Sequence, residues 1–326
     1  MKIKLGEALR YEQPTKYIVA SEKYNDSYAT PVLTAGKSFI LGYTNEESGI
    51  YDNLPVIIFD DFTTDIKYVD FPFKVKSSAM KMLQPANENY NLKFFYYLIK
   101  YMNFQPTSHQ RHWISKFAEM EFDIPERVKQ DQIVEKLDKL VEMQSKKTIQ
   151  LKKYDDLVKS QFIEMFNNKN FEQVLLSAVI DYEQPTKYIV SSENYKDEYP
   201  TPVLTAGKSF ILGFTNEING IYKGSDKPTL IFDDFTTDCK YVDFDFKVKS
   251  SAMKLLHLKN ADEQLLYYFY AINKIGFKPE SHQRHWISKF ANFKVGKPPI
   301  ELQNQFADFV KHIDKLKYND EFMEVA

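Results

Sequence analysis

Two near-copies of one long segment follow each other along the chain, and this duplication constrains the fold more than any other feature of the sequence. Residues 11–42 match residues 182–213 at 27 of 32 positions, and residues 58–82 match residues 231–255 at 22 of 25. The segment SHQRHWISKFA occurs twice without a change. The offset of 171 to 173 residues is far longer than the roughly 20 to 50 residues of a solenoid repeat. The chain is therefore expected to hold two copies of one domain.

Each copy is expected to mix strands with a helix. Short β-branched and aromatic runs bounded by Gly, Pro, Asn and Asp are typical of strands. In the first copy these runs are Pro31–Leu33, Phe39–Leu41, Val56–Phe59 and Tyr68–Val75. Asn91–Asn103 carries its apolar residues on one side of a helical repeat, which predicts an amphipathic helix. Its counterpart, Glu263–Ile275, keeps that pattern with few identities, so we interpret this helix as scaffold.

A long helix is predicted between the copies. Residues 126–166 contain neither Gly nor Pro and place apolar side chains at steps of three and four. At 1.5 Å per residue this helix would be about 60 Å long. A shorter seam follows Pro298 and Pro299, and we expect the two helices to pair antiparallel in a coiled coil. Because the second helix is predicted to span only about twenty residues, the central seam from about Thr148 onward is expected to lack its partner.

The predicted fold class is α+β, with four segments. They are a first domain at residues 1–124, a central helix at 125–168, a second domain at 169–297 and a shortened C-terminal helix at 298–326. A length of 326 residues suits two domains of ordinary size, each burying its own core.

Composition narrows the class of protein. The single cysteine, Cys239, excludes a disulfide within the chain, and it stands where the first copy has Ile66, which indicates a buried hydrophobe in a reducing compartment. No apolar run approaches the roughly eighteen residues of a membrane span, and the N-terminus has no apolar signal core, so we expect a cytoplasmic protein. The formal net charge is −2. A DNA-binding face would therefore require Lys and Arg to gather on one side of each domain.

The TAGKS loops at residues 34–38 and 205–209 resemble part of a phosphate-binding loop. That loop needs a glycine separated by four residues from its Gly-Lys pair, and Pro31 and Pro202 stand there instead. We interpret each loop as a turn that presents a lysine and a serine to a DNA phosphate. The candidate residues are Lys37, Ser38, Lys208 and Ser209.

The FDDFTTD segments at Phe59–Asp65 and Phe232–Asp238 cluster carboxylates. Such groups hold magnesium in some nucleases, but the adjacent acid and lysine that those enzymes normally carry do not stand out. Acidic residues at the end of a strand commonly form turns. Aspartate can also accept a hydrogen bond from cytosine N4. Threonine can contact a base edge or a thymine methyl, which makes candidate DNA contacts of Thr63, Thr64, Thr236 and Thr237.

The repeated SHQRHW segment is dense in hydrogen-bond donors. Arg pairs well with guanine, Gln with adenine, and His can donate to phosphate. The His-x-x-His spacing is compatible with a metal, but no third ligand lies nearby in the sequence. The Trp and the following Ile are expected to anchor the segment in the core. The predicted DNA contacts are His109, Gln110, Arg111 and His112 in the first copy and His282, Gln283, Arg284 and His285 in the second.

Four parts follow one another in a recognisable order. A domain with these motifs precedes a long helix containing KSQFIEMF (Lys159–Phe166), and a second such domain precedes a helix start of the form Pro-Pro-x-x-Leu-Gln-x-Gln-Phe (Pro298–Phe306). This order resembles the specificity subunits of type I restriction-modification systems, and YEQPTKYIV, PVLTAGKSFILG, FDDFTT and SHQRHWIS are similar to one class of their target-recognition domains. Neither a glycine-rich adenosylmethionine loop nor an Asp/Asn-Pro-Pro-aromatic tetrad is found, so we expect a non-catalytic chain.

The resemblance implies a subunit that reads double-stranded DNA and binds no cofactor itself. Two modification subunits would dock on the helices and methylate adenine N6 from S-adenosylmethionine, and restriction subunits using ATP and magnesium would join them. The site would be bipartite, with half-sites close to inverted repeats because the two domains are nearly identical. Residues 126–166 and 300–317 would carry the partner contacts, although the second helix is shorter than is usual in the family. The candidate partner contacts are Ile133, Leu137, Leu140, Leu151, Val158, Phe162, Phe306, Val310 and Ile313.

Two other classes stay open at this point. A metal-dependent endonuclease would use the aspartates of FDDFTTD and the histidines of SHQRHW as its metal site. A structural or regulatory protein would use the helices to bind other proteins and would bind no DNA.

Overall fold

A computed structural model describes residues 2–34, 38–106, 110–167, 169–205, 209–280 and 282–322. For residues 320–322 it describes the backbone only. The chain divides into two compact units, Met1–Ser145 and Lys146–Ala326. The boundary falls inside the central helix α3 (Arg127–Phe166), which was predicted to form a segment of its own. Each end of this helix therefore belongs to a different unit, and each unit is described separately.

The described residues of the first unit form three small sheets. Its strands are β1 (Lys2–Lys4), β2 (Leu9–Glu12), β3 (Thr30–Leu33), β4 (Ile40–Thr44), β5 (Val56–Asp60), β6 (Ile66–Val69), β7 (Lys74–Val75), β8 (Met80–Pro85) and β9 (Glu121–Asp123). The strand orders are β2-β8-β5-β6, β4-β3-β7 and β1-β9. The helical elements are α1 (Leu5–Ala8), η1 (Pro14–Tyr17), α2 (Leu92–Tyr101) and η2 (Phe117–Glu119).

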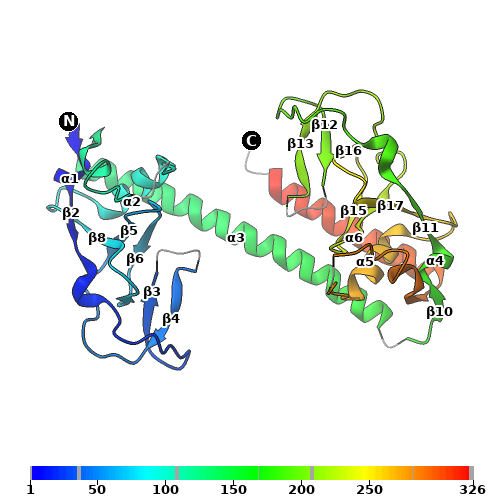
Figure 1. Ribbon diagram of the computed structural model, residues 1–326, viewed down its shortest axis with the longest axis horizontal. Helices are drawn as coiled ribbons and strands as arrows, with labels where there is room; N and C mark the ends of the chain where they lie inside the picture. Colours follow the sequence, from blue (N-terminus) through cyan, green and yellow to red (C-terminus); the bar gives the residue numbers. More distant parts are fainter. Residues whose placement is uncertain are drawn as a thin grey trace. The chain divides into compact units, whose positions relative to one another are not determined.

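The second unit repeats this plan element by element (Figure 1). Its strands are β10 (Glu172–Leu175), β11 (Ile180–Glu183), β12 (Thr201–Leu204), β13 (Ile211–Thr215), β14 (Thr229–Asp233), β15 (Cys239–Val242), β16 (Lys247–Val248), β17 (Met253–Leu258) and β18 (Lys294–Lys297). The orders β11-β17-β14-β15, β13-β12-β16 and β10-β18 match those of the first unit. The helical elements are α4 (Leu176–Val179), η3 (Pro185–Tyr188), α5 (Leu265–Lys274), η4 (Phe290–Asn292) and α6 (Ile300–Phe322). The predicted duplication and the mixed fold class are confirmed.

Strand β5 organises the first unit because it is buried on both faces. Successive side chains of a strand point to opposite sides. Ile57 and Phe59 accordingly enter the core beside α2, whereas Val56 and Ile58 enter a second core beneath the three-stranded sheet. This arrangement fixes the position of the turn that follows β5.

The helix expected at residues 91–103 is α2, and its start is capped. The side chain of Asn91 accepts hydrogen bonds from the backbone N–H groups of Lys93 and Phe94, which satisfies donors that a helix start leaves unpaired. The single strand predicted over Tyr68–Val75 is wrong. It is divided between β6 and β7, which lie in different sheets, and Pro72 between them has no N–H to continue a ladder.

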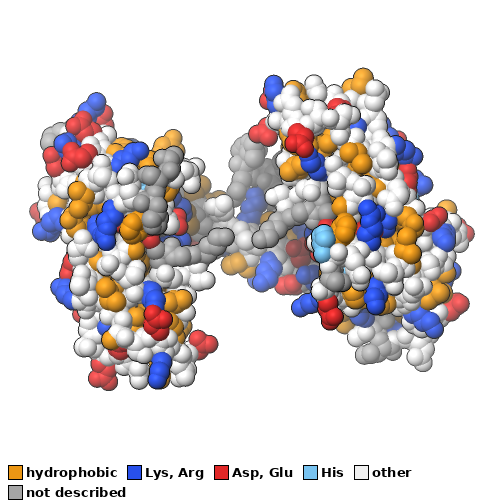
Figure 2. All heavy atoms as spheres, viewed as in Figure 1, with side chains coloured by type: hydrophobic (Ala, Val, Ile, Leu, Met, Phe, Trp, Pro, Cys, Tyr) orange, Lys and Arg blue, Asp and Glu red, His pale blue; other side chains and the backbone are white. Residues whose placement is uncertain are grey.

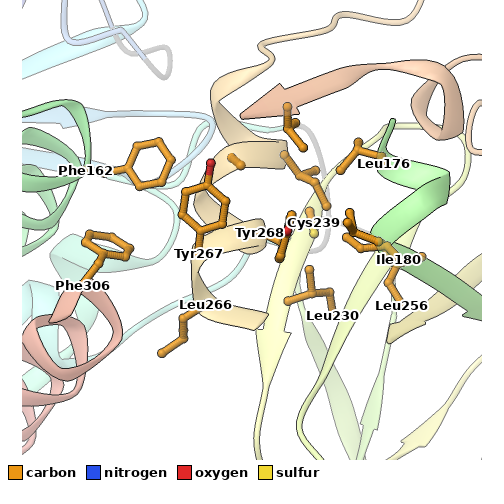
Figure 3. Close-up of a cluster of buried hydrophobic side chains, with 14 of the residues drawn as sticks. Phe162, Leu176, Ile180, Leu230, Cys239, Leu256, Leu266, Tyr267, Tyr268 and Phe306 are labelled. Atoms are coloured by element: carbon orange, nitrogen blue, oxygen red, sulfur yellow. The ribbon is translucent and has the colours of Figure 1, made fainter. Parts of the chain in front are cut away.

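The C-terminal half of α3 belongs to the core of the second unit. Phe162 packs against Phe306 of α6, with ring centroids 5.3 Å apart, and Lys317 forms an ion pair of 2.7 Å with Asp155. The α3 positions descend as the α6 positions rise, so the two helices run antiparallel here. Figure 3 shows Phe162 and Phe306 beside Tyr267 of α5. Coiled-coil packing stays a prediction.

This pairing corrects the expectation about the seam. The half of α3 after Thr148 has α6 as its partner, and the half near Leu140 is exposed. An antiparallel helix that begins beside the C-terminal end of α3 must run back toward its middle, so a short α6 covers the second half first.

Cys239 lies in the same core, and burial raises the pKa of its thiol. Among the described residues, no helix is long and apolar enough to cross a membrane.

Candidate nucleic-acid interface

The turn after β5 is held by the first aspartate of FDDFTTD. Asp60 Oδ1 accepts hydrogen bonds from the backbone N–H groups of Phe62 and Thr63, at 2.7 and 2.6 Å. Thr64 then adopts a positive φ of 62°, a conformation that non-glycine residues rarely adopt. Its hydroxyl donates to the carbonyl oxygen of Thr63 at 2.6 Å. Asp60 therefore shapes the turn, as expected for an acidic residue that ends a strand.

The second aspartate forms a fully buried ion pair. Asp61 Oδ2 lies 2.9 Å from Lys81 Nζ, and both side chains are 1% exposed. Lys81 is on β8, directly beside β5. Asp61 Oδ1 also accepts a hydrogen bond of 2.8 Å from the backbone N–H of Trp113. One carboxylate thus joins the β5 turn, the neighbouring strand and the SHQRHW segment, and its charge is compensated where water cannot screen it.

Arg111 is the exposed group that this buried pair positions. Its Nη1 lies 3.6 Å from Asp61 Oδ2, and its side chain is 51% exposed. The guanidinium also lies over the ring of Phe62, 5.7 Å from the centroid, which favours a flat, oriented cation. Because Lys81 already compensates the charge of Asp61, the guanidinium remains available to an anion or to a guanine edge.

The second unit reproduces this arrangement. Lys254 Nζ lies 3.1 Å from Asp234 Oδ2, and Trp286 N donates to Asp234 Oδ1 at 2.7 Å. Arg284 Nη1 lies 3.8 Å from the same carboxylate and is also 51% exposed. Its guanidinium lies 5.8 Å from the ring centroid of Phe235. Both units therefore present one arginine, supported in the same way.

Aromatic stacking extends this surface in the second unit. The exposed ring of His282 stacks on Phe235, with centroids 4.5 Å apart and an interplanar angle of 14°. In the first unit, Lys116 Nζ lies 4.2 Å above the ring of Phe104. Flat rings beside cations are the combination that binds bases and phosphates together.

Two predicted histidine contacts are wrong. His112 and His285 are 2% and 1% exposed, respectively, and lie in the interior beside Phe104 and Phe277. Their backbone N–H groups each donate at 2.8 Å to the carbonyl oxygen of the second aspartate, Asp61 or Asp234. These histidines anchor the segment and do not face solvent.

The second threonine of each FDDFTTD segment, Thr64 or Thr237, forms hydrogen bonds within or beside its turn. Thr64 is buried, and its hydroxyl is used within the turn, so the prediction that it reads a base is wrong. Thr237 has a φ of 66°, and its half-buried hydroxyl donates to the carbonyl oxygen of Phe277 at 3.4 Å. Its side chain is therefore directed inward as well.

The remaining candidates divide into two groups. Those with exposed side chains are Ser38, Thr63, Gln110, Ser209, Thr236, His282 and Gln283. Lys37, His109 and Lys208 lie outside the described residues. The exposed candidates stay predictions.

Five of the predicted partner contacts hold the chain to itself. The expectation that they face another subunit is corrected, because burial in the second unit leaves them inaccessible. They are Val158, Phe162, Phe306, Val310 and Ile313. Ile133, Leu137 and Leu151 are partly exposed, and Leu140 is exposed.

Sequence reasoning missed the residues that support the arginine. Lys81 and Phe62 were not singled out, and Asp61 was considered as a metal ligand, a turn former or a base contact, but not as the partner of a buried lysine. One signal was present. Lys81 and Lys254 are repeated lysines within apolar strands, and a lysine in such a strand requires a buried acidic partner.

The charge pattern is mixed. Figure 2 shows Lys and Arg interspersed with acidic and hydrophobic side chains on the visible face of each unit. No group of three or more His, Cys, Asp or Glu side chains suited to a metal ion occurs among the described residues. The carboxylates of Asp60 and Asp61 are instead engaged by backbone N–H groups and, for Asp61, by Lys81.

Comparison with known proteins gives a consistent result. No protein-family model matches the chain. The specificity subunit of the type I restriction enzyme EcoR124I/EcoR124II of Escherichia coli is 48% identical over 159 residues, which are 45% of this chain and 39% of that relative. The chain therefore matches less than half of the relative's length.

Structural comparison covers almost the whole chain. The S subunit of a type I restriction-modification system from M. genitalium superposes with a TM-score of 0.66 at 14% identity, over 98% of this chain and 91% of the other. The chain has the specificity-subunit fold. The predicted resemblance is thus confirmed. The HsdS subunit of Thermoanaerobacter tengcongensis aligns over 98% and 90% of the two chains at 15% identity, but its TM-score of 0.35 is too low to support an argument.

Proposed function

We propose that the chain is a non-catalytic DNA-recognition subunit of a type I restriction-modification complex. The observation that carries the proposal is the half-exposed arginine that each unit presents, Arg111 or Arg284, held between a buried carboxylate and an aromatic ring. An arginine that is fixed before binding loses less side-chain entropy on contact. A bidentate pair between arginine and guanine contributes about 1 to 3 kcal/mol of discrimination against the wrong base.

The duplicated arrangement suggests the form of the target. Because both units present the same arginine from the same local geometry, we propose a bipartite site whose half-sites are close to inverted repeats. Direct contacts would come from the turn after β5 or β14 and from the SHQRHW segment.

The partners follow from the same proposal. Two modification subunits would supply adenine N6 methylation from S-adenosylmethionine, and restriction subunits would supply the chemistry that uses ATP and magnesium. This chain would bind none of these cofactors. Its location would be the cytoplasm, where the partner subunits and DNA are found.

The endonuclease alternative gains no support from the geometry. Asp60 is engaged by two backbone N–H groups, and Asp61 is paired with Lys81 at 1% exposure. Binding a metal ion there would require both arrangements to be broken. The buried His112 provides no ligand at the surface.

Methylation mapping tests the proposal. The chain would be co-expressed with the modification subunit of its own operon, and N6-methyladenine would be located in host DNA by single-molecule sequencing. We expect a two-part motif. Arg111→Ala should relax or abolish recognition in one half, Arg284→Ala in the other, and the double variant should remove methylation at the motif.

Arg10→Ala provides the control. Arg10 is exposed on β2 and is not part of the turn or the SHQRHW segment, so this variant loses the same charge without touching the proposed contact. Its motif should be unchanged. A soluble complex that produces no methylated motif, or a motif unaffected by the double arginine variant, would contradict the proposal.

A further inference from the structure

One tyrosine in each unit lies over the buried lysine of the candidate interface. In the first unit, Lys81 Nζ lies 5.2 Å from the ring centroid of Tyr11. In the second unit, Lys254 Nζ lies 4.5 Å from the ring centroid of Tyr182. Both distances are within the roughly 6 Å at which an ammonium group is attracted to an aromatic face. This contact is therefore part of the arrangement that the two units share.

The sheet explains why these side chains meet. Tyr11 is on the edge strand β2, where it pairs with Leu83 of β8. Lys81 precedes Leu83 by two residues on β8, so its side chain points to the same face of the sheet. Diagonal neighbours of this kind are about 7 to 8 Å apart, within reach of aromatic and long side chains. Because β8 lies between β2 and β5, the ring approaches the ammonium group from one side and Asp61 from the other.

Charge alone does not fix the position of the lysine. Among the described residues, neither Lys81 Nζ nor Asp61 Oδ2 has a hydrogen-bond partner, although the two atoms are 2.9 Å apart. Attraction without hydrogen-bond geometry has little directional preference. A buried ammonium group also needs other groups to compensate its lost hydration. The ring of Tyr11, itself 41% exposed, provides an aromatic face for this purpose.

The lysine competes with the arginine for one carboxylate oxygen. Asp61 Oδ2 lies 2.9 Å from Lys81 Nζ and 3.6 Å from Arg111 Nη1. A lysine released from the ring would extend its flexible side chain to water. The buried carboxylate would then take the guanidinium as its main counterion. Arg111 would be drawn inward, away from its exposed position over Phe62.

We propose that Tyr11 and Tyr182 are positioning residues. Each tyrosine holds the buried lysine against the second aspartate of FDDFTTD and thereby leaves the arginine of its unit free to contact DNA. The positioning depends on the aromatic face and not on the hydroxyl group. The contact with DNA rests on the proposed function, whereas the position of the arginine does not.

Chemical modification of arginine tests the positioning without DNA. The full chain would be treated with phenylglyoxal, which modifies accessible guanidinium groups, and peptide mass spectrometry would give the rates at Arg111 and Arg284. Different residues, Gln105 and Lys278, precede the repeated segment, so the two peptides are distinguishable. Tyr11→Leu should slow modification of Arg111 at least about threefold, because a desolvated contact between a cation and a ring biases the exchange by about tenfold. The rate at Arg284 should stay the same.

Matched variants separate positioning from a general loss of structure. Tyr11→Phe keeps the aromatic face, so both rates should equal those of the parent chain. Tyr182→Leu should slow modification of Arg284 and leave Arg111 unchanged. A variant that merely loosened the fold would expose the arginine further and raise its rate, which is the opposite change. If one leucine variant failed to fold, the other would apply the same test to its own unit.

Methylation mapping connects the positioning with recognition. With the modification subunit co-expressed, Tyr11→Leu should relax the same half of the motif as Arg111→Ala, and Tyr11→Phe should leave the motif intact. A motif that Arg111→Ala leaves unchanged would contradict the proposed function, and the modification rates would still decide the position of the arginine.

Two results would overturn the inference. The first is a modification rate at Arg111 that Tyr11→Leu leaves unchanged or raises. The second is a slowed rate at Arg111 together with a motif that Arg111→Ala alters and Tyr11→Leu does not.

Discussion

The ion pair between Asp61 and Lys81 joins the stability of the first unit to the geometry of its exposed arginine. Two buried charges are stable only while both are present, because an isolated buried ion loses its hydration without compensation. Arg111 lies 3.6 Å from the carboxylate and is half exposed, so it would replace Lys81 only in part.

Removal of Lys81 should therefore destabilise the first unit. Lys81→Met is expected to lower the free energy of unfolding of the first unit by about 3 to 5 kcal/mol. The measurement is urea unfolding followed by Trp113 fluorescence in a Trp286→Phe background. A double variant that adds Asp61→Asn should recover part of this loss, because no unpaired charge remains. The exposed Lys129→Met should change stability by less than about 0.5 kcal/mol, and an equal loss there would contradict this explanation.

One histidine makes the second unit sensitive to acid. His257 stands where the first unit has Gln84, and its ring stacks on Tyr222. Burial lowers the pKa of His257 below its ordinary value of 6.5, and Lys227 adds to this effect against the opposing carboxylates of Glu183 and Asp181.

The direction in which pH changes the stability of the second unit follows from proton linkage. Well above pH 6.5 the imidazole is neutral in both the folded and the unfolded state and contributes no pH dependence. Below it the unfolded chain binds the proton more readily, so stability falls until the lower folded pKa is reached. In a Trp113→Phe background, the unfolding midpoint reported by Trp286 should fall as the pH drops below about 7. His257→Gln should remove this part of the pH dependence, and an unchanged slope would refute the assignment.

At the scale of the site residues, the sequence predicted the exposed Arg111, whose contact with DNA stays a prediction, and the role of Asp60 in the turn. It wrongly predicted that the buried His112 is exposed. A segment that stays unchanged between copies can be preserved for packing as well as for binding. Burial in an irregular loop depends on strands far away in the sequence, so side-chain direction could not be predicted there.

At the scale of the elements, α3 shows how far periodicity can be used. Its bounds lie within one residue of the predicted run 126–166 and within two residues of the predicted segment 125–168, because a run without Gly or Pro and with a regular apolar stripe has few alternatives. The half covered by α6 was predicted wrongly. An apolar stripe indicates that a helix packs against a partner, but it does not indicate where along the helix that partner begins.

Substitutions on the buried and on the exposed face of α3 should lower the free energy of unfolding by very different amounts. Phe162 is 5% exposed, and the neighbouring Ile163 is 50% exposed. Phe162→Ala should lower the unfolding free energy of the second unit by about 3 to 5 kcal/mol, because it leaves a cavity among Tyr267, Tyr270 and Phe306. Ile163→Ala should cost less than about 1 kcal/mol. Fluorescence of Trp286 reports both, and similar losses would contradict the packing described here.

At the scale of the whole molecule, the duplication predicted that both units would share one topology, and they do so strand by strand. The two-stranded sheets formed by β1 with β9 and by β10 with β18 were not predicted. Each joins segments more than 100 residues apart. Local sequence patterns do not predict such a pairing.

The contiguity of the first unit matters during synthesis. All of its elements lie within Met1–Ser145, and the matching strands of the second unit emerge only later. A nascent chain can therefore close its first core before nearly identical strands exist to compete for the same positions. A denatured full-length chain has no such order, because both sets of strands are present at once, and strand exchange between the copies becomes a route to misfolding. The ribosome thus separates in time two segments that their sequences hardly distinguish.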